Sequence, residues 1–187
     1  MKMKSPDDSK QPSNLETGFS NYKSSLEQQG RFDLLKRVID ILEKKSVKYS
    51  VVGGYGLDGL HGELTRDHDD IDIIVGSEDM EQTRILLSNI GFQRQKDKPS
   101  GLEVYFHNLT KTKLELADLK LVKYFFDGDE KIIMPQTANG TLAGILFKVA
   151  TLGGQKILRD IQSKRLGGKG PNMAHDEKII DDLKTKT

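Results

Sequence analysis

The sequence predicts an α/β (α+β) fold in which a small mixed β-sheet is flanked by helices, with further helices at the C-terminus. Three observations support this prediction. Apolar residues recur at helical spacing after residue 30, short apolar runs typical of strands follow, and helical patterns resume toward the C-terminus. This order of helices and strands is typical of a sheet that buries its apolar face against helices.

Lysine, glycine and serine residues indicate where the expected helices and strands begin and end. Residues 1–26 hold almost no aliphatic side chains, so we expect a disordered tail before the folded part. Lysines suit the end of the first helix, glycines end the first strand and second helix, and Gly76-Ser77 precedes the third helix. The expected elements are, in order, a helix over 32–45, a strand over 48–52, a helix over 55–60, a strand over 71–75, a helix over 80–90, strands over 102–106 and 113–116, and helices over 142–152 (capped by Thr137 or Asn139), 155–166 and 173–183.

Composition narrows the class of function. A chain of 187 residues suggests one domain, and a net charge of +1 does not mark a non-specific nucleic-acid binder, although a nucleic-acid partner is not excluded. The absence of cysteine excludes disulfides, thiolate metal sites and cysteine nucleophiles. No apolar run reaches the roughly 18 residues of a membrane span. We therefore expect a cytoplasmic protein with no membrane partner, and the oligomeric state is not indicated.

Two acids in an apolar strand are the strongest chemical signal. Side chains of a strand alternate between its faces, so Asp70 and Asp72 project to one face, about 6–7 Å apart, while Ile71 and Ile73 project to the other. Adjacent carboxylates repel each other unless a cation lies between them. Mg²⁺ prefers such oxygen ligands and keeps positions open for substrate phosphates. The pattern predicts a magnesium site in which the two carboxylates bridge two ions.

A third carboxylate would complete such a site. Glu115 fits best because it lies between Leu114 and Leu116 in a β-type run, and Asp118 is the competitor. An unpaired charge in such a run would be costly without a partner. The hypothesis requires that the third acid face the first two. It would be wrong if these side chains were splayed apart, or capped by lysines with no room for an ion.

A glycine-rich turn precedes the acidic strand. Gly53 and Gly54 lie where a strand ends and a helix begins, and there backbone N–H groups can approach an anion closely. Gly54-x-Gly56-x-x-Gly59 also matches the dinucleotide-binding fingerprint. We reject that interpretation because an acidic strand and a hairpin follow in place of a second long βαβ unit.

At these residues the chain resembles the lincosamide and aminoglycoside 2″-type antibiotic nucleotidyltransferases of the DNA polymerase beta-like superfamily. Tyr55 stands where these enzymes usually carry Trp, and Glu115 where many carry Asp. The run from His175 to Leu183 resembles the helix that often closes small members. The motif that carries the resemblance is Gly53-Gly54-Tyr55-Gly56-Leu57-Asp58, then Gly62, Arg66, His68 and Asp70-Ile71-Asp72-Ile73.

The resemblance implies a nucleotidyltransferase domain over 27–187, with its core at about 27–135 and a helical part at about 136–187. Asp70 and Asp72 would bind Mg²⁺, and Glu115 would be a metal ligand or the general base. The implied reaction moves AMP from ATP to a hydroxyl of a small-molecule acceptor, with lincosamides and aminoglycosides as candidate acceptors.

The resemblance also implies the nucleotide contacts. Gly53 and Gly54 would contact the triphosphate through their backbone, and Arg66 would pair with a phosphate or instead with a neighbouring Asp. His68 would orient an aspartate or lie exposed, and Lys148 would reach a phosphate or be solvated.

Two other functions remain open from sequence. One is nucleotidyl transfer to protein or tRNA, as in toxin–antitoxin systems, and the other is a degenerate nucleotide-binding module. A basic groove would favour the first of these, with candidates Lys156, Arg159, Lys164, Arg165 and Lys169.

Overall fold

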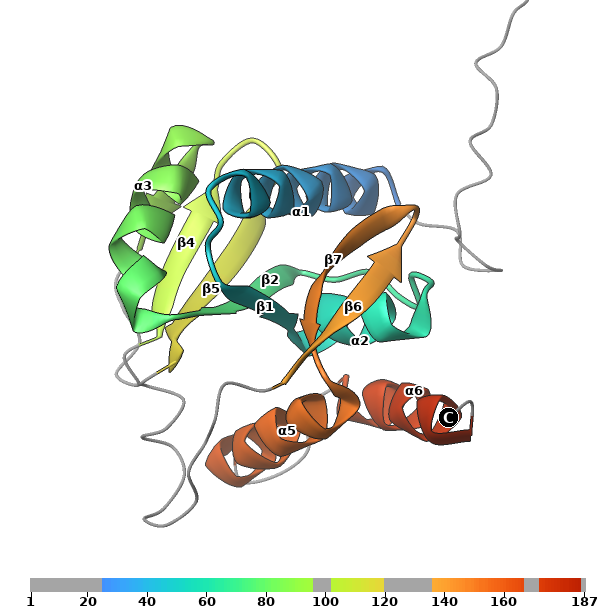
Figure 1. Cartoon of the computed structure of the whole chain (residues 1–187). Helices are drawn as coiled ribbons and strands as arrows, with labels where there is room; N and C mark the ends of the chain where they lie inside the picture. The colour runs from blue at the N-terminus through green and yellow to red at the C-terminus, as the bar shows by residue number, and fades with distance from the viewer. Residues whose placement is uncertain (1–24, 96–101, 120–135, 167–171, 186–187) are drawn as a thin grey trace, which may run out of the picture.

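The computed structural model describes residues 25–95, 102–119, 136–166 and 172–185 (Figure 1). Residues 1–24 of the expected tail, and Lys169, lie outside the described residues. In chain order the elements are α1 (Leu26–Lys44), β1 (Tyr49–Val52), α2 (Gly53–His61), β2 (Asp70–Val75), the 3₁₀ turn η1 (Ser77–Asp79), α3 (Met80–Asn89), β3 (Phe92–Arg94), β4 (Glu103–His107), β5 (Thr112–Asp118), β6 (Thr137–Leu142), β7 (Ile145–Ala150), α5 (Leu152–Leu166) and α6 (Met173–Thr185).

The strands form one seven-stranded mixed sheet in the order β3-β4-β5-β2-β1-β7-β6. The strand β2 pairs antiparallel with β1 and parallel with β5, and β7 runs parallel to β1. This mixed sheet with flanking helices confirms the predicted fold class. Because β2 lies at the centre of the sheet, both of its neighbours can present side chains beside its own.

One face of the sheet forms the main core beneath α1 and α3. Ile71 and Ile73 of β2 and Leu114 and Leu116 of β5 are at most 1% exposed and belong to this core. Burying an aliphatic side chain of this size contributes about 1.5–3 kcal/mol. Because strand side chains alternate, this burial directs the intervening polar residues of β2 and β5 to the opposite face.

The C-terminal helices α5 and α6 lie on the side of α2 that faces away from α1 and α3 (Figure 1). Leu57 of α2 packs against Ile179 and Ile180 of α6 in a second, smaller apolar cluster. Figure 1 shows α5 and α6 together below α2, apart from α1 and α3. None of the described helices is long and apolar enough to cross a membrane.

The helix predicted over residues 142–152 is wrong. This segment belongs to the hairpin of β6 and β7, and α5 begins only at Leu152. Ala143 and Gly144 form its two-residue turn, with φ of 47° and 78°. Positive φ at both positions is the geometry of the tight hairpin turns that match strand twist. The part of the chain after residue 136 is therefore not wholly helical, and it supplies two strands to the sheet.

Candidate active site

The strand acids lie on the sheet face opposite the main core. In the parallel pairing of β2 with β5, Asp72 is opposite Glu115 and Asp70 is opposite Lys113. Residues in register on neighbouring strands point to the same side of a sheet. Asp70, Asp72 and Glu115 therefore share one face, as the sequence-based hypothesis required.

The competing acid lies on the other face. Asp118 is opposite Val75, one residue out of phase with Glu115, and its carboxylate accepts a hydrogen bond of 2.5 Å from the Ser77 hydroxyl. This contact joins the end of β5 to the start of η1. Of the two candidates for the third carboxylate, Glu115 alone shares the face of Asp72.

A lysine that the sequence-based reasoning did not consider lies among these acids. The Lys113 Nζ is 2.8 Å from Asp70 Oδ2 and 2.9 Å from Glu115 Oε1. Burial alone would lower the pKa of Lys113, but hydrogen bonds to the two carboxylates raise it above its usual range. The ammonium therefore remains charged and holds Asp70 and Glu115 together. The period-two alternation of β5 could have indicated that residue 113 shares the face of residue 115.

The donor set suits a hard divalent cation, but Lys113 stands within it. Among the described residues, no group of three or more acidic or histidine side chains is arranged to hold a metal ion in this conformation. The carboxylates themselves are the oxygen ligands that Mg²⁺ prefers. Two of them already bind a cationic group, which shows that this part of the face accommodates positive charge. The residues therefore fit a metal ion on the condition that Lys113 moves away.

The two glycines at the start of α2 bring backbone against the site. A Cβ built on Gly53, whose φ is +67°, would overlap with the Asp72 carboxylate. A Cβ on Gly54 would overlap with the His68 ring and lie 2.9 Å from Arg66 Nη2. Since α2 begins here, its N-terminal N–H groups also favour an anion. Both positions thus require glycine for space.

Replacing Gly53 by Ala should strongly reduce turnover, because the methyl group must displace the Asp72 carboxylate. The left-handed backbone should add about 1–2 kcal/mol of destabilisation. Gly62 is the matched control, since its φ is +91° but a Cβ there would meet no atom within 4 Å. Gly62→Ala should therefore cost stability and leave turnover intact, as measured by thermal denaturation and steady-state kinetics. Equal loss of turnover in both variants would contradict this account.

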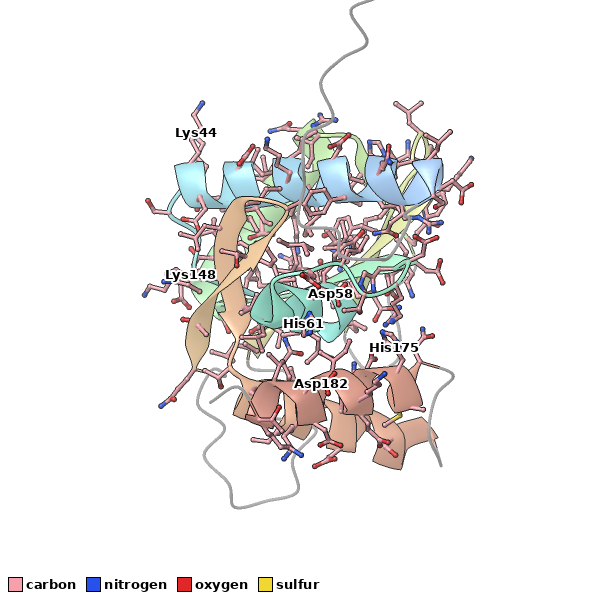
Figure 2. All side chains as sticks on the ribbon, turned by 90° about the vertical axis from the view of Figure 1, so that its right-hand side faces the viewer. Lys44, Asp58, His61, Lys148, His175 and Asp182 are labelled. Carbon is pink, nitrogen blue, oxygen red and sulfur yellow. The ribbon has the colours of Figure 1, made fainter. Side chains whose placement is uncertain are left out.

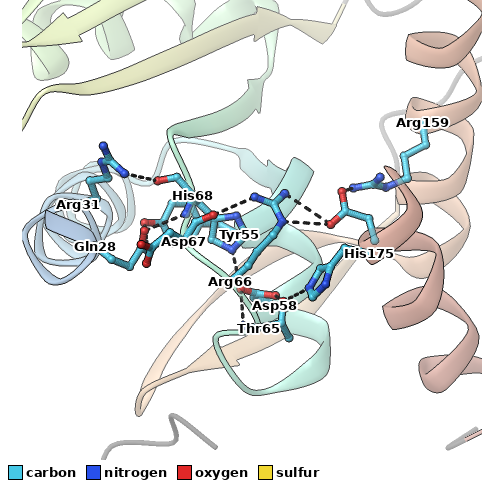
Figure 3. A network of polar contacts seen from close by, with 11 residues as sticks. Gln28, Arg31, Tyr55, Asp58, Thr65, Arg66, Asp67, His68, Arg159 and His175 are labelled. Atoms are coloured by element: carbon cyan, nitrogen blue, oxygen red, sulfur yellow. Dashed lines mark hydrogen bonds and ion pairs between the residues drawn. The ribbon is translucent and has the colours of Figure 1, made fainter. Parts of the chain in front are cut away.

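A buried network holds the loop between α2 and β2 (Figure 3). His68 Nε2 is 2.6 Å from Asp58 Oδ2, and the Thr65 hydroxyl donates to the other oxygen of Asp58 at 2.6 Å. Gln28 of α1 donates to the Tyr55 hydroxyl at 2.7 Å and accepts from the His68 backbone N–H at 2.8 Å. His68 thus orients Asp58 and is buried. The hydroxyl of Tyr55 has a specific partner in Gln28.

Arg66 connects the same loop to the C-terminal helices. Its Nε and Nη2 each lie 3.4 Å from Asp176 Oδ1 of α6, and its Nη1 donates to the Asp67 carbonyl at 3.0 Å. Arg159 of α5 donates to the second oxygen of Asp176 (Figure 3). The Asp176 side chain is only 4% exposed. The alternative expectation of an ion pair with a neighbouring aspartate is therefore wrong, and the carboxylate that Arg66 binds lies 110 residues away.

Three other basic candidates, Lys148, Lys156 and Arg159, have side chains that the structure describes. Arg159 is buried against Asp176, and Lys156 is exposed. Lys148 lies on β7 and not on a helix, and its ammonium donates to Asn139 at 2.7 Å. Figure 2 shows Lys148 on the outer side of the hairpin, pointing away from Asp58. The side chains of Lys164 and Arg165 lie outside the described residues.

The class of this protein, with its central Asp-x-Asp strand beside a Gly-Gly helix start, is that of a nucleotidyltransferase, as a family match shows. The family model for aminoglycoside-2″-adenylyltransferase matches residues 34–158, which is more than half of the chain. The chain therefore belongs to this family, which confirms the resemblance. The matched region contains all three carboxylates and both glycines of the site.

Solved structures agree with the fold. ANT(2″)-Ia, an antibiotic-resistance factor, superposes with a TM-score of 0.67 at 12% identity, covering 82% of this chain and 83% of its own. The lincosamide antibiotic adenylyltransferase LnuA, bound to lincomycin, superposes with a TM-score of 0.64 at 17% identity, covering 83% of this chain and 97% of its own. An antigenic nucleotidyltransferase-like protein from Paracoccidioides brasiliensis superposes with a TM-score of 0.53 at 19% identity, covering 86% of this chain and 76% of its own. Comparison with curated proteins finds no match.

Proposed function

We propose that this enzyme transfers AMP from ATP to a hydroxyl group of an aminoglycoside or lincosamide antibiotic in the cytoplasm, with Mg²⁺. The observation that carries this proposal is the pairing of Asp72 with Glu115 in register, beside the backbone of Gly53, in a member of this family. Solved structures of similar fold include an adenylyltransferase with bound lincomycin and one with adenylyl-2″-tobramycin.

Each residue of the site has a task in this reaction. Asp70 and Asp72 would hold Mg²⁺, which when bound stabilises negative charge on the polyphosphate. Glu115 would accept the proton of the acceptor hydroxyl. The hydroxyl oxygen then bonds to the α-phosphorus, the bond from this phosphorus to the bridging oxygen breaks, and pyrophosphate leaves with the electron pair.

The nucleotide contacts follow from the start of α2. Backbone N–H groups at Gly53 and Gly54 would donate to the triphosphate, helped by the positive end of the helix dipole. Arg66 lies against Gly54, so its guanidinium is placed to donate to the same phosphates. Asp176 would keep Arg66 in position until the nucleotide arrives.

The acceptor class is tested with ATP labelled at the α-phosphate, Mg²⁺ and four acceptors: tobramycin, lincomycin, total tRNA and a mixture of purified proteins. We expect label to move to tobramycin or lincomycin, because solved structures of similar fold hold lincomycin or adenylyl-2″-tobramycin. Mass spectrometry should then find one added AMP. Label found only on RNA or protein would reject the antibiotic acceptor while keeping the nucleotidyltransferase.

The third carboxylate is tested by two conservative variants. Glu115→Gln should lower kcat by about 10²–10⁴-fold, the usual contribution of a general base. Asp118→Asn should change kcat little, since Asp118 bonds to Ser77 on the other face of the sheet. Steady-state kinetics at saturating ATP make the comparison. A larger loss for the Asp118 variant, with its stability unchanged, would reverse the assignment.

A further inference from the structure

Lys113 differs from a lysine in an ordinary surface ion pair, because it is only partly exposed and contacts two carboxylates at once. Its side chain is 37% exposed, and the Glu115 side chain that it contacts is 13% exposed. It alternates along β5 with Leu114 and Leu116, which are buried in the core. The backbone register therefore holds Lys113 on the face of the acids, and its ammonium contacts two of the three.

These contacts reduce the repulsion between carboxylates in the unliganded enzyme. Asp70, Asp72 and Glu115 crowd one face, and neighbouring carboxylates raise each other's free energy unless a positive charge separates them. The Lys113 ammonium supplies that charge from within the chain. A divalent ion that binds Asp70 together with Asp72 must break the ion pair between Lys113 and Asp70.

We propose that Lys113 is an internal counter-cation that competes with the metal ion for the acids of the active site. The inference rests on the proposed function of these acids. While Lys113 is in place, the acids are positioned but bind a free divalent ion weakly. A nucleotide brings phosphate oxygens as further ligands and so raises the affinity of the site for the ion. The ion is therefore expected to bind together with the nucleotide.

The competition is measured with Mn²⁺, whose binding to the full chain is followed by electron paramagnetic resonance without nucleotide. Lys113→Met should bind Mn²⁺ at least about tenfold more tightly than wild type, because one nearby charge changes the proton affinity of a carboxylate by about 1–3 pKa units. Lys113→Arg keeps the charge and should bind as weakly as wild type. Lys148→Met removes a lysine from the outer side of β7 and should leave the affinity for Mn²⁺ unchanged.

A second readout is thermal stability. Without Mn²⁺ the Lys113→Met variant should melt below wild type, and added Mn²⁺ should raise its melting temperature more than that of wild type. Lys113→Gln, which is also neutral, replaces it if the Met variant does not fold.

The outcomes separate the two proposals. Equal or weaker Mn²⁺ binding by the neutral variants, or no binding to any variant, overturns the role of Lys113. If Asp72→Asn binds Mn²⁺ as well as wild type, the ion is not held by these acids, and both the proposed metal site and this inference fail.

Discussion

Asp72→Asn should reduce turnover by at least about a thousandfold, which corresponds to losing several kcal/mol of transition-state stabilisation from a bound metal ion. Asp72 is in register with Glu115, the proposed general base, and its carboxylate lies against Gly53, which is proposed to contact the nucleotide. The amide has the same shape but no charge to hold a divalent ion. The measurement is the rate of AMP transfer at saturating ATP, Mg²⁺ and acceptor.

Asp69→Asn is the matched control for this substitution. Asp69 is a neighbouring acid whose side chain is 88% exposed and forms an ion pair with Arg31. Its neutralisation should leave the rate of AMP transfer near that of wild type. If both variants keep normal turnover while remaining folded, Asp72 is not catalytic.

Asp176→Ala should destabilise the protein by about 3–5 kcal/mol, the cost of removing one partner from a buried charge network. Asp176 binds Arg66 of the loop before β2 and Arg159 of α5, so its loss leaves two guanidinium groups without their shared carboxylate. The side chain of Arg159 is 11% exposed, and water can replace little of what is lost there. Urea denaturation followed by circular dichroism measures the free energy of unfolding.

The control lies on the same helix. Asp181 of α6 is exposed and pairs with Lys184 one turn away, so Asp181→Ala should leave the urea midpoint almost unchanged. Equal midpoints for the Asp176 and Asp181 variants would show that the Arg66–Asp176–Arg159 network does not contribute to stability. Because Arg66 also lies against Gly54, the Asp176 variant should in addition raise the KM for ATP.

The sequence was sufficient for features that depend on neighbouring residues. Alternation along β2 placed Asp70 and Asp72 together on one face, and Gly62, at φ +91°, ended α2 where expected. It was insufficient for the hairpin at 137–150, because a short apolar run that contains alanine fits helical and strand patterns alike. The Ala143-Gly144 turn was the local signal that distinguished them. The short strand β3 was also missed, since three residues carry little periodicity.

By itself the sequence determined the α/β class, the acid pair, the glycine turn and the family resemblance, since each depends on residues close together in the chain. Tertiary structure alone decided that Glu115 and not Asp118 faces Asp72, that Lys113 bridges Asp70 and Glu115, and that Asp176 holds Arg66. The physical reason is that these contacts depend on the register of two strands and the docking of a distant helix. Register and docking are set by burial of the whole core, which no local pattern encodes.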